Sequence, residues 1–117
     1  MPQGSRIERV GEEFREILAE EIQKLKDPRV GFVTVTGVKV SPDLHHAWVY
    51  FTAFGDEKAQ AGTRAALRSA TKHLRHALGR QIRLKVTPEV EFVEDDMAEH
   101  GERIDHIIAQ IHNEERP

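Results

Sequence analysis

Apolar residues recur at helical spacing through the first quarter of the chain. They run from Ile7 through Phe14 to Leu25 and place one apolar face on the segment. A repeat of about 3.6 residues predicts an amphipathic helix in residues 5–28. Pro28 is expected to stop this helix, because the residue before a proline is disfavoured in the helical conformation.

Two segments with alternating apolar and polar residues follow. In "GFVTVTGVKV" (31–40) valines alternate with threonines until Gly37 shifts the alternation, which indicates a β-bulge. In "HAWVYFTAF" (46–54) the alternation resumes. The turn-forming sequence "SPDL" (41–44) joins the two segments, so they are expected to pair as an antiparallel hairpin.

The second half of the chain predicts one long helix and two weaker elements. Residues 56–78 lack proline and are rich in Ala, Leu, Arg and Lys, which favours a helix that Gly79 ends or kinks. A third strand is expected within 82–95, where Pro88 argues against a central place in the sheet. Isoleucines at helical spacing predict a short final helix in 102–112.

The predicted element order is α-β-β-α-kink-α-β with a short C-terminal helix. This order is typical of the α+β class, with helices packed on one face of a three-stranded sheet. A chain of 117 residues that is 38% hydrophobic can bury one modest core, so a single domain is expected over 5–112. The charged tail 113–117 is expected to be disordered.

Composition narrows the chemistry and the compartment. The chain has no cysteine, which excludes disulfides, thiol nucleophiles and cysteine metal sites. The seven histidines lack the spacing of a metal motif, and no nucleophile elbow, phosphate loop or dinucleotide fingerprint occurs. Neither an enzyme nor a metal, cofactor or small-molecule substrate is expected. No apolar run approaches a membrane span or a signal-peptide core, so a soluble cytoplasmic protein is expected.

The charge is distributed unevenly along the chain. The formal net charge is -3, yet residues 63–86 hold seven Lys and Arg and no Asp or Glu. The neighbouring segment 88–102 is acidic and has no Lys or Arg. A dipolar molecule follows, whose overall charge says little about its partners. The acidic segment either repels RNA from the wrong face or serves only solubility, and the sequence favours neither.

Helical geometry gathers the cations of the predicted long helix on one side. The apolar residues Leu67, Ala70, Leu74 and Leu78 point within about 40° of one direction. The cations Arg64, Arg68, Lys72 and Arg75 form a stripe about 80° wide, centred about 125° from it. A solvated helix normally interleaves glutamates at i,i+4, and none occurs here. The stripe therefore predicts a polyanionic partner, for which a phosphate backbone is the natural candidate. An interfacial membrane helix is less suitable, because the exposed face has no large apolar residues.

Three segments resemble the ribosome-binding factor A family, a group of bacterial ribosome-assembly proteins. They are "KDPRVGFVTVTGVKVSPDLHHAWVYF", "LRHALGRQIRLKVTPEVEFVED" and "HGERIDHII", in that order, and the resemblance covers about residues 5–112. The element order is also that of a type II KH-like RNA-binding fold. No two glycines are three apart, so the G-x-x-G clamp of KH domains is missing and Ala77-Leu78-Gly79 stands in its place.

The resemblance implies a monomeric, non-enzymatic factor that binds the free small (30S) ribosomal subunit through 16S rRNA. It also implies assistance with late maturation, including processing of the 16S rRNA 5′ end, especially in the cold. A KH-type module for single-stranded nucleic acid and a protein-binding adaptor remain as alternatives. Lys39 is a weaker candidate for RNA contact. The residues expected to bind RNA are Arg64, Arg68, Lys72, Arg75, His76, Ala77, Leu78, Gly79, Arg80, Arg83 and Lys85.

Overall fold

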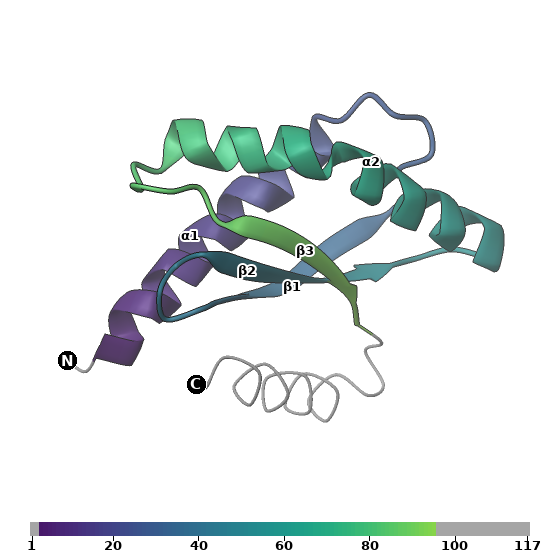
Figure 1. Ribbon diagram of the computed structural model, residues 1–117. Helices are drawn as coiled ribbons and strands as arrows, with labels where there is room; N and C mark the ends of the chain where they lie inside the picture. Colours follow the sequence, from purple (N-terminus) through teal and green to yellow (C-terminus); the bar gives the residue numbers. More distant parts are fainter. Residues whose placement is uncertain (1–2, 96–117) are drawn as a thin grey trace.

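The computed structural model describes residues 3–95, with side chains from residue 6 onward (Figure 1). The described residues form two helices and three strands. They are α1 (Gln3–Gln23), β1 (Val33–Val40), β2 (His46–Ala53), α2 (Glu57–Gln81) and β3 (Glu89–Glu94). The expected C-terminal helix and the charged tail lie outside the described residues.

The three strands form one mixed sheet in the order β1-β2-β3. β1 and β2 pair antiparallel, and the register shifts between Val35 and Gly37, which confirms the hairpin and the bulge. β3 pairs parallel with β2, because α2 carries the chain back across the sheet between them. Pro88 directly precedes β3, which is an edge strand as expected.

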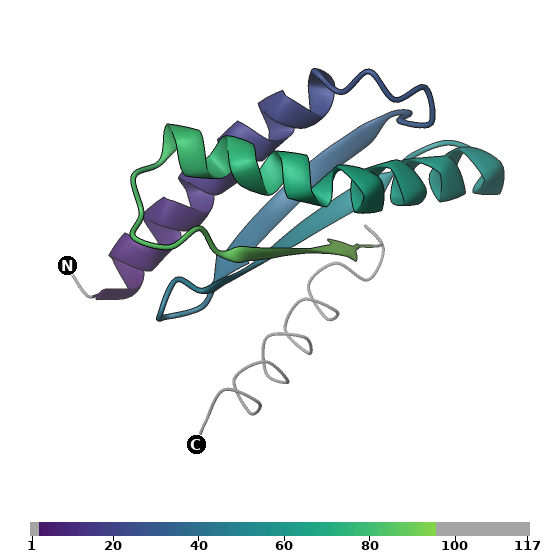
Figure 2. The same ribbon diagram turned by 45° about the horizontal axis from the view of Figure 1, so that its top comes forward.

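Both helices cover the same face of the sheet, as the two views in Figures 1 and 2 show. Apolar residues from every element meet between the helices and the sheet. The core includes Phe14 and Leu18 of α1, Val49 and Phe51 of β2, Leu67 and Leu74 of α2, and Val90 of β3. The expected α+β architecture with helices on one face of a three-stranded sheet is thus confirmed.

The loop between α1 and β1 rests on α2. α1 ends at Gln23, well before Pro28, and the chain then crosses to α2 without regular structure. The backbone N–H of Gly31 donates to the hydroxyl of Thr63 at 3.0 Å. This contact explains why a polar residue, Thr63, is fully buried on the apolar face of α2.

α2 is one helix from end to end. The Asp56 side chain caps its start by accepting from the N–H of Ala59 at 2.8 Å. Its end lies at Gln81, and the N–H of Ile82 still donates to the carbonyl of Leu78 at 2.9 Å. The predicted division of this helix at Gly79, with a further helix after a kink, is therefore wrong. A single glycine costs a helix only about 1 kcal/mol, which is too little to end it.

Gly79 has a packing role instead of a helix-breaking one. A Cβ atom at this position would lie 2.8 Å from the Thr87 hydroxyl oxygen. The loop 82–88 can therefore approach α2 closely only where the helix has no side chain.

No helix among the described residues is long and apolar enough to cross a membrane.

Candidate nucleic-acid interface

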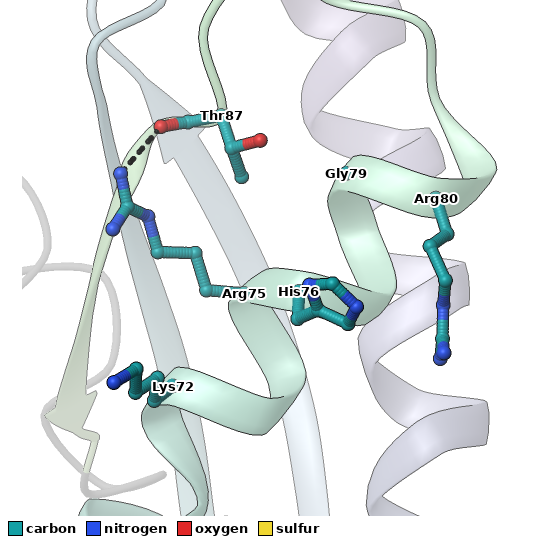
Figure 3. A pocket seen from close by; sticks show the side chains of 6 residues that line it. All are labelled: Lys72, Arg75, His76, Gly79, Arg80 and Thr87. Carbon is teal, nitrogen blue, oxygen red and sulfur yellow. Dashed lines mark hydrogen bonds between the residues drawn. The ribbon is translucent and has the colours of Figure 1, made fainter.

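One exposed surface of α2 carries cations that point away from the core. We call this surface the outer face and define it by Lys72, His76 and Arg80, all of which are exposed. Together with Arg75, Gly79 and Thr87 they line an open pocket of about 520 Å³. Figure 3 shows this pocket on the C-terminal half of α2, below the loop that follows the helix. The outer face also lacks acidic side chains, since α2 has none beyond Glu57.

Arg75 lies beside the outer face but directs its guanidinium at the protein. Its Nη2 donates to the carbonyl oxygen of Thr87 at 2.8 Å (Figure 3). Its Nε donates to the carbonyl oxygen of Pro88 at 2.9 Å. The carboxylate of Glu89 lies 3.4 Å from Nη2. Arg75 thus ties the loop 82–88 and the start of β3 to the helix.

Arg64 is also engaged within the protein. Its Nη1 lies 3.0 Å from both carboxylate oxygens of Glu94, and its Nη2 donates to Glu57 at 2.8 Å. These hydrogen bonds, that of Glu57 first and that of Glu94 second, raise the pKa of Arg64 above its usual value. Its charge is therefore compensated by two carboxylates.

Arg68 lies between Arg64 and Arg75 in the sequence of α2 and is exposed. With Arg64, Glu91 and Glu94 it lines a second pocket, of about 320 Å³, between α2 and β3. We call the side of α2 with Arg64, Arg68 and Arg75 the β3-facing edge. The predicted cationic stripe therefore consists of two different surfaces, an outer face without acids and an edge opposite carboxylates.

The remaining predicted residues fall into three groups. Ala77 and Leu78 are 0% and 1% exposed, so their side chains belong to the core and do not form surface. Arg83 and Lys85 are exposed on the loop 82–88, next to the outer face in sequence. Lys39 pairs with Trp48 in the sheet, between two core-facing valines of β1, and so it points to the sheet face opposite the helices.

Several residues of this site are not predicted by the sequence patterns. Thr87 lines the first pocket and meets Gly79, and Glu57 and Glu94 hold Arg64. Glu57 and Arg64 are two helical turns apart, a spacing that is readable in the sequence. The partner on β3 depends on the parallel register, which local sequence does not encode.

Metal binding finds no support among the described residues. They contain no group of three or more His, Cys, Asp or Glu side chains that could hold an ion. His73 and His76 are both exposed on α2. Imidazoles on a cationic surface without carboxylates are suited to phosphate contact.

A three-stranded sheet with two helices on one face and a cationic helix surface defines an α+β domain of KH-like architecture. The family described as ribosome-binding factor A matches residues 6–108 of the chain. The chain belongs to the ribosome-binding factor A family.

Three comparisons illustrate the similarity. The ribosome-binding factor A of Geobacter sulfurreducens is 44% identical over 111 residues, which is 94% of each chain. A solution structure of a Thermotoga maritima protein of this family has a TM-score of 0.71 at 33% identity, over 82% of this chain and 92% of that one. A homology model of the Thermus thermophilus protein, fitted into a cryo-EM map of its complex with 30S, has a TM-score of 0.61 at 38% identity, over 71% of this chain and 88% of that one.

Proposed function

We propose that this protein binds the free small ribosomal subunit through 16S rRNA, with the outer face of α2 and the loop 82–88 as its contact surface. The single observation that carries this proposal is the acid-free cationic surface formed by Lys72, His76 and Arg80. Family membership supports it, since the related Thermus thermophilus protein was fitted into a map of a 30S complex.

The contacts follow from the chemistry of the exposed groups. The ammonium groups of Lys72 and Lys85 and the guanidinium groups of Arg80 and Arg83 bind phosphate oxygens, and each neutralised phosphate releases counterions. Phosphate contacts do not read the base sequence, so recognition depends on the shape of a folded rRNA site.

The cellular role we propose is assistance with late maturation of the subunit, including processing of the 16S rRNA 5′ end. Growth in the cold is where its loss has the largest effect, because misfolded RNA helices melt more slowly at low temperature. The acting form is a cytoplasmic monomer with a single domain over 5–112. It acts by binding and catalyses no reaction.

Gradient sedimentation of a cell extract tests this function. The expected result is co-sedimentation with free small subunits, and loss of this association after nuclease treatment or in high salt. Absence from the small-subunit fractions would contradict the proposal. Tight binding to short unstructured oligonucleotides would indicate a single-strand module instead, and a partner retained after nuclease treatment would indicate a protein adaptor.

A further inference from the structure

We propose that Glu94 of β3 is a specificity-determining residue, because it competes with RNA phosphates for Arg64. By this competition it confines RNA to the outer face of α2. The inference rests on the proposed function, since it concerns which RNA the same helix accepts.

The ion pair of Arg64 is the first step of the argument. Both carboxylate oxygens of Glu94 lie 3.0 Å from its Nη1, and Glu57 accepts a hydrogen bond from its Nη2 at 2.8 Å. Both terminal nitrogens of the guanidinium thus already face carboxylates. A phosphate gains Arg64 only by displacing a carboxylate, so the contact releases little net free energy.

Arg68 is the second step. Its side chain is exposed and is available to a phosphate by geometry alone. Glu94 lines the same pocket of about 320 Å³, whereas Glu91 pairs with Trp48 and so points to the sheet face opposite the helices. A phosphate that approached Arg68 in this pocket would therefore meet the negative charge of Glu94, whose repulsion opposes the attraction of the guanidinium.

The outer face offers the contrast. Among the described residues, neither Lys72 nor Arg80 forms an ion pair, and no acidic side chain lines their pocket. One helix thus carries cations that are open to phosphates and cations that are matched with carboxylates. RNA that binds by charge alone gains little from the cations of the β3-facing edge, because carboxylates oppose those contacts. RNA that fits the shape of the outer face does not need the edge cations. Specificity is a difference between affinities, and these carboxylates enlarge it.

The test compares two single variants with the same change in net charge. Glu94→Gln removes the competing charge, and Glu13→Gln removes one exposed charge from α1. The probes are a random-sequence RNA duplex and purified free small subunits. We expect the β3 variant to bind the duplex about fivefold more tightly at low salt, with a salt dependence steeper by about one counterion. Its affinity for the subunit should change less than twofold, and the α1 variant should change neither affinity more than about twofold.

Equal duplex affinities of the β3 variant and the α1 variant would overturn the proposal. If Glu94→Gln lowers the melting temperature, Glu57→Gln serves as the variant, because it frees the Nη2 of the same guanidinium, and a duplex affinity equal to wild type then overturns the proposal. The two proposals fail separately. Wild-type protein that does not bind subunits contradicts the proposed function, whereas wild-type binding with unchanged duplex affinity in the β3 variant contradicts only this inference.

Discussion

Gly11 lies on α1 and Gly37 on β1, and the two glycines differ in the atoms that an added Cβ would meet. A Cβ at Gly11 would lie 2.8 Å from the carbonyl oxygen of Val38, because α1 packs directly on the backbone of β1 there. At Gly37, in the bulge of β1, nothing lies within 4 Å of the Cβ position. The first glycine therefore sets the distance between helix and sheet, and the second does not.

Gly11→Ala is expected to lower the free energy of unfolding by about 1–3 kcal/mol, because a backbone oxygen cannot move aside as a side chain can. The higher helix propensity of alanine offsets only about 1 kcal/mol of the steric cost. Gly37→Ala is the matched control and should stay within about 0.5 kcal/mol of wild type. Urea unfolding measures both, and an unchanged midpoint for Gly11→Ala would contradict this packing.

Tyr50 is buried on β2, and its hydroxyl has no hydrogen-bond partner in the described part of the chain. Burial raises the pKa of Tyr50 to about 12, and the charges of Asp95 and Glu91 add to the shift. The unfolded chain keeps the ordinary value of 10.0, so it loses this proton first as the pH rises. Ionisation of Tyr50 therefore does not lower the free energy of unfolding below pH 10. The free energy of unfolding falls as the pH rises from 10 toward 12.

Tyr50→Phe tests this linkage. At pH 7 the variant should be as stable as wild type or slightly more stable, because it buries no unpaired hydroxyl. Between pH 10 and pH 12 wild type should lose stability relative to the variant. Denaturant unfolding across this range measures the difference, and parallel stability curves would show that the pKa of Tyr50 is not raised.

At the scale of elements, α2 and the loop 82–88 are held together by few contacts. Arg75 donates to the carbonyls of Thr87 and Pro88, and Gly79 lets Thr87 approach the helix. Arg83 and Lys85 lie on this loop and are exposed. The geometry of the proposed RNA surface therefore depends on a close approach between a helix and a loop.

Gly79→Ala and Thr87→Ala should be strongly coupled. In wild type the new methyl would meet the Thr87 hydroxyl oxygen at 2.8 Å, so Gly79→Ala should destabilise the protein. In the Thr87→Ala background the clash is gone, and the same change should be neutral or stabilise by up to about 1 kcal/mol through helix propensity. A double-mutant cycle should give a coupling of about 1 kcal/mol or more. Additive effects would show that the loop does not contact Gly79.

The sequence predicted those elements whose signals are local. The alternation of 31–40 and 46–54 gave the hairpin, and Gly37 marked the bulge. The end of α2 was mispredicted because Gly79 serves a contact with Thr87, which lies beyond the helix. Glu94, the β3 partner of Arg64, was not predicted, because it depends on how β3 aligns with β2. Long-range register is set by packing, and no local pattern reports it.

At the scale of the whole molecule, the net charge of -3 conceals how the charge is arranged. Residues 63–86 carry seven cations, and the structure turns some toward carboxylates and leaves others open. The open cations gather on the outer face of α2 and the loop 82–88. The central claim is that this surface, and not the overall charge, binds the rRNA of the small subunit.

The most direct test measures affinity for purified free small subunits as a function of salt. Lys72→Gln/Arg80→Gln removes two charges from the outer face, and Arg6→Gln/Arg9→Gln removes two exposed charges from α1. The first variant should bind about tenfold more weakly and release about two fewer counterions, since each lost phosphate contact lowers the salt slope by about one. The control should match wild type. Equal affinities and equal slopes for the two variants would contradict the central claim.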